Sequence, residues 1–383
     1  MEETMQEWFG LKEGHRDLKI ETDTDARLFF GRHELNKQLH AILRRSFRTD
    51  SPPKMVLYGG WGVGKTHTMR HLEYVVETND GFPAIVVFVE LPDITSKSTF
   101  QVAHAAFLDA LGLPRAQHWV LQFQTLHPAD AQDLIRDFTQ SGDISTAFRN
   151  LLVPGEGSRI AWDWLRGLAI SAGDARLAGL PPSLSQSNSF VKVLEMFGRL
   201  AKDIEQKLLV FMLDEATKLS YVSNTDAVNH WTNALKALAD QQMKEVGFIV
   251  SGSWVETDEM ALPLQDQQVV TRFGDPNYIL LQSLDEVDTK AFIGSLLGEW
   301  VDDVARERLT GEFASDADGE DIAASSFPFT ERGLDIAAAY ACRQGGYTTP
   351  RDIQVTLDDL LNRAIDDERH IVSSIYLTSL ING

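Results

Sequence analysis

The chain contains only one cysteine, Cys342, among 383 residues. A single cysteine cannot form an internal disulfide, so a reducing compartment, the cytoplasm, is the expected location. Long apolar runs are also missing: the longest extend over about six residues, such as Leu208 to Leu213, whereas a membrane helix needs about 20. The first residues show neither the positive region nor the apolar stretch of a signal peptide. We therefore expect neither export nor a membrane partner.

Basic residues are scarce, with 35 Lys and Arg against 56 Asp and Glu and a net charge of −21. So acidic a chain is not expected to coat nucleic acid with its whole surface, because the phosphates would repel it. The charge is uneven, however. Residues 27–70 hold nine basic and two acidic residues (+7), and residues 284–370 hold eight basic and twenty acidic residues (−12). These regions indicate either a head-to-tail contact between copies of the chain or two solvated surfaces.

The hydrophobic fraction of 43% and the charged fraction of 24% are typical of a globular chain with a sizeable core. Five nearly continuous apolar runs, rich in β-branched and aromatic residues, predict parallel strands buried on both faces. These runs are 54–58, 84–90, 208–213, 247–251 and 278–281. Helix-period segments flank them at 32–47, 66–77, 99–112, 189–205 and 226–242. This alternation predicts an α/β fold with a central parallel sheet flanked by helices.

The strand signal largely disappears after residue 285. Four helical patterns then predict a C-terminal all-α domain, at 285–300, 302–313, 330–343 and 350–366. An acidic segment rich in small residues, 315–326, predicts a loop between them. Residues 113–188 contain several prolines and glycines among helical stretches, which predicts a helical insertion before the third strand.

The strongest chemical signal lies between the first strand and the helix that follows it. The segment is Gly59-Gly60-Trp61-Gly62-Val63-Gly64-Lys65-Thr66. Its glycines let backbone amides curl round a phosphate chain, toward which the next helix points its positive N-terminus. Lys65 is expected to reach the β- and γ-phosphates and Thr66 to ligate Mg²⁺. We expect the segment through His67 to contact a nucleotide, and Trp61 to pack on its own domain, with stacking on a base or a neighbouring subunit as the alternative.

A second signal is the apolar run that ends in Asp214 and Glu215. Two carboxylates after a buried strand are what a Mg²⁺-nucleotide hydrolase needs opposite its phosphate loop. Asp214 would hold the metal through water, and Glu215 would orient and polarise the attacking water. The pair therefore predicts hydrolysis as well as binding.

At this point the chain resembles the AAA+ ATPases of the origin-recognition and initiator branch, and four further segments add to the resemblance. Phe29-Phe30-Gly31-Arg32-His33-Glu34-Leu35 resembles the family's N-terminal box beside the adenine. Ser251 or Ser253, at the end of the fourth strand, resembles the polar sensor 1. Val270-Thr271-Arg272-Phe273 resembles the arginine-finger segment, which acts on the neighbouring subunit's nucleotide. Thr349-Pro350-Arg351-Asp352 resembles the segment with the sensor 2 arginine of the lid. Arg272 as a plain surface residue and Arg351 as an ordinary first-turn residue are the alternatives.

The resemblance implies ATP and Mg²⁺ as cofactors and the following organisation. Residues 1–26 would be an N-terminal arm, 27–282 the nucleotide-binding core, 283–367 a helical lid and 368–383 a C-terminal tail. A homo-oligomeric ring or filament would form with Arg272 acting in trans.

The segment from Ala161 to Gly167, with Trp162 and Trp164, resembles a Trp-containing insertion of BREX-type phage-defence ATPases. Regulators of transposon target selection are the nearest rival. The leading hypothesis is thus an ATPase that self-assembles and controls partner proteins in a DNA-linked process. Any DNA contact is expected from Arg44, Arg45, Arg48 and Lys54, for which a solvated helix face or an interface with the acidic lid is the alternative. The alternative is an ATP-dependent switch that regulates an effector such as a nuclease without binding DNA; a scaffold that barely hydrolyses ATP is a third reading.

Overall fold

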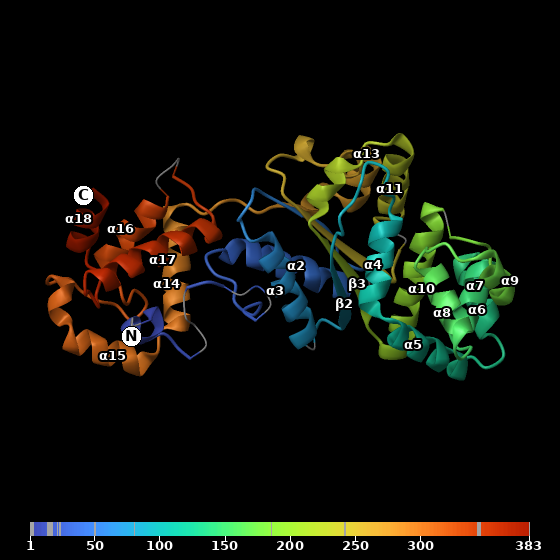
Figure 1. The fold of residues 1–383 in the computed structure, drawn as a ribbon, viewed down its shortest axis with the longest axis horizontal. Helices are drawn as coiled ribbons and strands as arrows, with labels where there is room; N and C mark the ends of the chain where they lie inside the picture. The colour runs from blue at the N-terminus through green and yellow to red at the C-terminus, as the bar shows by residue number, and fades with distance from the viewer. Residues whose placement is uncertain are drawn as a thin grey trace. The chain divides into compact units, whose positions relative to one another are not determined.

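The computed structural model describes residues 4–13, 18–20, 22, 24–49, 51–79, 81–184, 186–240, 243–342 and 346–382. The chain divides into two compact units. The helical unit comprises Met1–Lys37, Gly60–His71 and Leu281–Gly383, and the sheet unit comprises Gln38–Gly59 and Leu72–Leu280. Figure 1 shows the elements of both units in chain order.

The sheet unit is built on five parallel strands in the order β2-β3-β4-β1-β5. The strands are β1 (Lys54–Tyr58), β2 (Ala84–Glu90), β3 (Leu208–Asp214), β4 (Val246–Gly252) and β5 (Tyr278–Leu280). All five lie within one residue of the predicted runs. Strands β3 and β4 are buried along their whole length, which explains why their sequences are continuously apolar. The predicted α/β fold with a parallel sheet is confirmed.

Helices flank the sheet close to where the periodicity predicts them. Five correspond to predicted segments, namely α2 (His33–Arg48), α3 (Lys65–Thr78), α4 (Gln101–Leu111), α10 (Ser187–Glu205) and α11 (Thr225–Leu238), whereas the short helices α12 (Leu262–Gln265) and α13 (Gln267–Phe273) were not predicted. Most ends agree within two residues, but α11 ends four residues early, at Leu238. Short 3₁₀ turns complete the unit, η1 (Ala216–Tyr221), η2 (Thr257–Glu259) and η3 (Asp275–Asn277).

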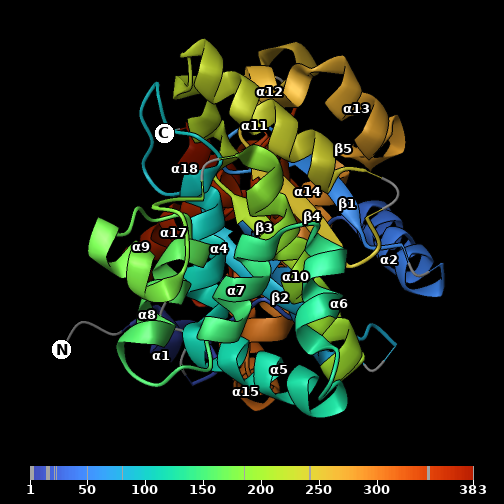
Figure 2. The ribbon, with the colours of Figure 1, turned by 90° about the vertical axis from the view of Figure 1, so that its right-hand side faces the viewer.

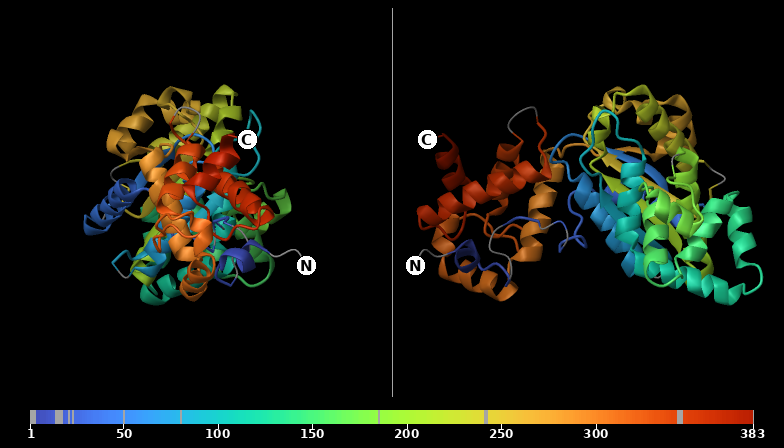
Figure 3. Two further views of the ribbon diagram at one scale, coloured as in Figure 1. Left: turned by 90° about the vertical axis from the view of Figure 1, so that its left-hand side faces the viewer. Right: turned by 45° about the vertical axis from the view of Figure 1, so that its right-hand side comes forward.

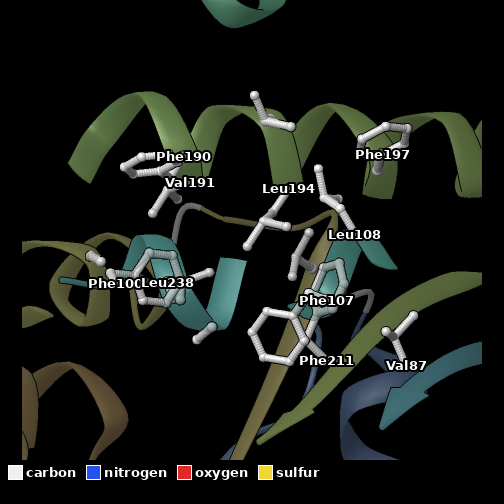
Figure 4. Packing of buried hydrophobic residues seen from close by; sticks show 14 of the residues in the cluster. Val87, Phe100, Phe107, Leu108, Phe190, Val191, Leu194, Phe197, Phe211 and Leu238 are labelled. Atoms are coloured by element: carbon white, nitrogen blue, oxygen red, sulfur yellow. The ribbon is translucent and has the colours of Figure 1, made fainter. Parts of the chain in front are cut away.

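One face of the sheet is covered by α4 and α10 through aromatic packing. Figure 4 shows Leu194 pointing from α10 toward Phe107 and Leu108 of α4, which lie over Phe211 of β3. The rings of Phe107 and Phe211 are 4.8 Å apart between centroids. Burial of aromatic and aliphatic side chains at such density supplies most of the stabilisation of a sheet layer.

Five further helices occupy the region of the predicted insertion. They are α5 (Leu113–Leu126), α6 (Ala131–Thr139), α7 (Gly142–Asn150), α8 (Glu156–Leu165) and α9 (Ala172–Ala178). Figure 2 shows them gathered beside α10. Trp162 and Trp164 of α8 are buried in the same core as the sheet, so these two tryptophans stabilise the fold rather than form an exposed surface.

The helical unit contains α14 (Glu286–Trp300), α15 (Asp303–Glu312), α16 (Glu331–Ala341), α17 (Pro350–Asp366) and α18 (Ser374–Asn382), which confirms the predicted helical C-terminal region. Its core includes buried Phe292, Trp300, Phe327 and Leu361. The short helix α1 (Met5–Phe9) joins the same core, because Phe9 is fully buried and the Trp8 indole donates a 2.9 Å hydrogen bond to the carbonyl of Arg369. Figure 3 shows this N-terminal segment beside the C-terminal helices.

The acidic segment 315–326 is a series of turns around η4 (Ala314–Ala317). Its carboxylates bind the chain near α18: Asp316 accepts from the backbone N–H of His370 at 3.0 Å, and Glu320 accepts from that of Ser374 at 3.0 Å. Across the residues that the structure describes, no helix combines the length and apolar character needed to cross a membrane.

Candidate functional site

The glycine-rich segment forms a tight loop between β1 and α3. Gly62 and Gly64 have φ of 76° and 87°, a region that residues with a side chain rarely adopt. A Cβ on Gly62 would lie 2.8 Å from Thr349 Oγ1, whereas a Cβ on Gly64 would meet nothing within 4 Å. Gly62 is therefore required for both conformation and space, and Gly64 for conformation.

Lys65 is the first residue of α3 and is 9% exposed. Its Nζ donates a 2.7 Å hydrogen bond to the carbonyl of Gly60, so the ammonium lies over the loop. The hydroxyl of Thr68 donates to the carbonyl of Gly64 at 2.8 Å and fixes the start of the helix. A cation and a helix N-terminus at a curled glycine loop together suit a chain of phosphates.

A cavity of about 300 Å³ opens beside this loop within the helical unit. The residues that line it come from the N-terminal segment, the loop and α3, α14 and α17. They are Ile20, Thr22, Phe29, Phe30, Arg32, Gly62, Val63, Gly64, His67, Thr68, Phe292, Pro350, Arg351 and Gln354. Aromatic and aliphatic side chains and a phosphate loop line this one cavity, which matches the two ends of a nucleotide, an apolar base and an anionic tail.

Arg32 supplies a partly buried positive charge to this cavity. Its Nη2 donates a 2.6 Å hydrogen bond to the carbonyl of Gln282. Burial lowers the pKa of Arg32 to about 10, against the opposing effect of Asp288, so the guanidinium stays charged at neutral pH. An anion in the cavity would offset the cost of burying this charge.

His67 lines the same cavity, but its ring is not a cation at neutral pH. Burial lowers the pKa of His67, and its Nε2 lies 2.6 Å from the carbonyl of Leu28. Nε2 therefore carries the proton and donates to that carbonyl. The ring ties α3 to the segment that precedes Phe29, so its role as a nucleotide contact stays a prediction.

A buried carboxylate, that of Asp214, lies at the carboxyl end of β3 in the sheet unit. Asp214 is 3% exposed and accepts two hydrogen bonds on Oδ1, one from Ser251 Oγ and one from the backbone N–H of Glu215 at 2.9 Å. Strand β4 lies between β3 and β1, so the end of β1, where the glycine loop begins at Gly59, belongs to the same edge of the sheet. Ser251 is the serine whose hydroxyl reaches Asp214. Ser253 contributes its backbone N–H, which donates to Thr217 Oγ1 at 2.5 Å.

Glu215 has an unusual backbone conformation. Its φ of 56° and ψ of 30° are left-handed, and η1 begins immediately after it. Left-handed backbone is costly for a residue with a Cβ and is typical of functional sites.

The two candidate arginines have different surroundings. Arg351, in the first turn of α17, is exposed and lines the nucleotide cavity. Arg272 of α13 is 38% exposed, and its Nε lies 3.9 Å from Asp240 Oδ2, at the edge of a separate polar cavity that also includes Lys236.

Two predictions are wrong. Trp61 is 69% exposed and does not pack on its own domain. Lys54 does not share an exposed basic face, because it is 8% exposed and its Nζ donates to the carbonyls of Asp240 and Met243. By contrast, Arg44, Arg45 and Arg48 are exposed on α2.

The sequence reasoning missed Lys218 of η1. Its Nζ donates to the carbonyl of Leu91 at 2.7 Å and to Glu90 Oε1 at 3.1 Å, and lies 3.4 Å from Asp93 Oδ1. Its position three residues after Glu215 was the one available signal, and the sequence does not say which strand lies beside it.

The glycine loop, the cavity beside it and the buried Asp214 at the end of β3 are the features of a P-loop nucleotide-binding protein. The model of the AAA ATPase domain family matches residues 28–250, more than half of the chain. The chain belongs to this family, and it is an ATPase with the parallel P-loop fold of the AAA+ class.

Several solved structures are similar to the chain. The Aeropyrum pernix Orc1 protein in complex with DNA is 12% identical with a TM-score of 0.47, over 93% of this chain and 66% of that one. Cdc6p from Pyrobaculum aerophilum is 13% identical with a TM-score of 0.48, over 89% of this chain and 64% of that one. The chain thus spans slightly less than two thirds of the length of both. A RuvB variant from Thermotoga maritima is 12% identical with a TM-score of 0.39, over 92% of this chain and 70% of that one. The comparison with curated proteins returned no significant match.

Proposed function

We propose that this ATPase binds and hydrolyses Mg-ATP, assembles with copies of itself, and controls partner proteins in a DNA-linked process such as phage defence or mobile-element control. The observation that carries the nucleotide part is the cavity of the helical unit, because a phosphate loop, a partly buried Arg32 and apolar rings line one space.

In this proposal the loop residues and Lys65 bind the phosphates and Arg32 adds charge near them. The hydroxyl of Thr66 forms no hydrogen bond with the described part of the chain, which leaves it available to a metal ion. Oxygen ligands of this kind suit Mg²⁺, which would neutralise charge on the phosphates when bound. Asp214 would hold the ion through water, and Ser251 would keep that carboxylate oriented.

Glu215 would orient and polarise the attacking water, since its side chain follows directly on Asp214. The αL conformation gives its side chain a direction different from that of a residue continuing the strand. Arg351 would contact the phosphates from the first turn of α17, whose Thr349 cap and Pro350 fix the helix start.

Arg272 would complete the site of a neighbouring copy. The side chain is partly exposed, and its closest carboxylate is 3.9 Å away, a weak pairing from which a stronger anion such as a γ-phosphate can draw it. A ring or a filament would follow from repeated use of the same contact. Hydrolysis would then weaken the assembly, because the anion that holds Arg272 is lost.

DNA contact is proposed for Arg44, Arg45 and Arg48 of α2. All three are exposed, and no carboxylate pairs with them in the described part of the chain. If each arginine contacts one phosphate, the association constant for DNA should fall in proportion to the salt concentration raised to roughly the power 2.7. The affinity would then drop about 40-fold between 50 and 200 mM salt.

The alternative is an ATP-dependent switch that holds an effector such as a nuclease without touching DNA. The exposed Trp61 in the phosphate loop favours it, because an exposed indole beside a nucleotide site is a suitable contact for a protein partner.

The test is steady-state ATP hydrolysis with and without double-stranded DNA at 50 and 200 mM salt, with Lys65→Ala as the blank. Stimulation by DNA that falls with salt and is lost in Arg44→Ala/Arg48→Ala supports the DNA-linked function. A hydrolysis rate per molecule that is unchanged by DNA but rises with protein concentration supports the switch. Turnover at the level of the Lys65→Ala blank refutes hydrolysis by this chain alone.

A further inference from the structure

We propose that Lys218 is a positioning residue for Glu215, holding the turn that carries this side chain between the ends of β2 and β4. The inference rests on the proposed role of Glu215 in hydrolysis. Lys218 belongs to no sequence motif, and the contacts around η1 are the evidence for its role.

The first observation is that Glu215 needs external support. Its φ of 56° is one that a residue with a side chain rarely keeps in a loop that is free to relax. The residue connects the rigid end of β3 to η1, so the position of η1 determines whether this conformation persists.

The second observation is that η1 is held from the β4 side. Thr217 Oγ1 accepts a 2.5 Å hydrogen bond from the backbone N–H of Ser253, one residue after β4 ends. The backbone N–H of Lys218 donates to the carbonyl of Glu215 at 3.1 Å, which closes the turn.

The third observation is that Lys218 holds η1 from the β2 side. Its Nζ donates to the carbonyl of Leu91 at 2.7 Å, and the backbone N–H of Leu91 donates to the carbonyl of Asp214 at 2.9 Å. The peptide unit at Leu91 thus links the ammonium to the residue that precedes Glu215. Leu91 is fully buried, so its carbonyl has no access to bulk water as a replacement partner.

The carboxylates around Lys218 explain why a lysine is suited to this position. Glu90 Oε1 lies 3.1 Å from Nζ and Asp93 Oδ1 lies 3.4 Å away, while the lysine side chain itself is only 23% exposed. The charge is balanced on one side by these acids, and the buried carbonyl receives a charge-assisted hydrogen bond. An apolar side chain of similar length, such as methionine, would leave that carbonyl without a hydrogen-bond donor.

The ion pair with Asp93 provides a matched control. Asp93 is fully exposed, so its pairing with Lys218 is screened by water and is expected to contribute little. Asp93→Asn removes one charge next to Lys218 but leaves the bonds to Leu91 and Glu90 in place.

The experiment combines amide hydrogen exchange with ATPase kinetics for Lys218→Met, Lys218→Arg and Asp93→Asn. For Lys218→Met we expect exchange at Glu215, Lys218 and Ser253 to quicken about tenfold or more, with core strands unchanged. We expect kcat to fall about tenfold or more while the Kd for a fluorescent ATP analogue stays within about twofold, because misplacement of a catalytic group affects the chemical step. Lys218→Arg should restore most of kcat, and Asp93→Asn should match the wild type in both measurements.

Unchanged exchange in Lys218→Met overturns the proposal whatever the enzyme's activity. Faster exchange with wild-type kcat also overturns it, since the lysine would then act on local stability alone. If the wild-type chain shows no turnover above the Lys65→Ala blank, it is the proposed hydrolysis that fails, and the exchange data still decide whether Lys218 holds the turn. Should Lys218→Met not fold, Lys218→Gln replaces it, because glutamine is polar but lacks both the charge and the length with which Lys218 reaches the carbonyl of Leu91, and it is expected to show the same changes.

Discussion

The left-handed backbone at Glu215 predicts that a side chain at this position lowers the free energy of unfolding, a cost accepted for its role in the site. For a residue with a Cβ, the left-handed conformation costs about 1–2 kcal/mol. Glycine avoids that cost but loses about 0.5–1 kcal/mol through the greater freedom of its unfolded chain. Glu215→Gly should therefore be more stable than Glu215→Ala by about 0.5–1 kcal/mol. The two variants are compared with each other because both lack the wild-type carboxylate, so its removal affects them equally.

The assay is urea unfolding followed by tryptophan fluorescence, without nucleotide, on both variants. Gln206 supplies the matched control, because it has φ of 58° at the end of α10 and no proposed role in the chemistry. Gln206→Gly should be more stable than Gln206→Ala by a similar free energy of unfolding. Both Glu215 variants should lose turnover by at least about 100-fold, as expected for removal of a general base. An alanine variant at 215 as stable as the glycine variant would refute the claim of strain.

Three further outcomes are expected. Arg272→Ala and Lys65→Ala should each be inactive alone, but a mixture should regain part of the wild-type rate if Arg272 acts in trans, and a mixture as inactive as either variant contradicts this. Gly62→Ala should weaken ATP-analogue binding about tenfold or more in a fluorescence titration, because a Cβ there would lie 2.8 Å from Thr349 Oγ1 at a φ of 76°. Burial raises the pKa of Glu195 from 4.5 to about 7. Between these pH values the folded chain binds more protons than the unfolded chain. The free energy of unfolding should therefore fall as pH rises from about 4.5 to 7, by at most about 3 kcal/mol. Glu195→Gln should flatten that slope in urea melts across this range, and an equally steep slope in the variant would count against the assignment.

Local sequence determined the strands and the phosphate loop. The strands were predicted within one residue because each is a short run of β-branched and aromatic residues between polar segments. The loop at Gly59 to Thr66 was predicted because its chemistry depends on neighbours in sequence, the glycines and the lysine that opens α3. Asp214 was predicted for the same reason, since a carboxylate at the end of an apolar strand is a local pattern.

Lys54, Trp61 and Lys218 show what local sequence did not determine. Lys54 stands among basic residues in sequence, yet β1 carries it into the interior, where backbone carbonyls bind it. Tryptophan is a residue type usually found in protein cores, but Trp61 is 69% exposed in the phosphate loop. Lys218 meets Glu90 and Leu91 only because β2 lies beside β3 in the sheet.

The physical reason for this division is the range of the interactions. Strand propensity, glycine conformation and helix capping act between residues a few positions apart, so the sequence by itself determined the elements and the phosphate loop. Charge partners and burial depend on which strands are adjacent, and the order β2-β3-β4-β1-β5 is set by the packing of the whole sheet unit. Tertiary structure therefore decided which charged residues face solvent, that Ser251 rather than Ser253 contacts Asp214, and how the turn after Glu215 is held.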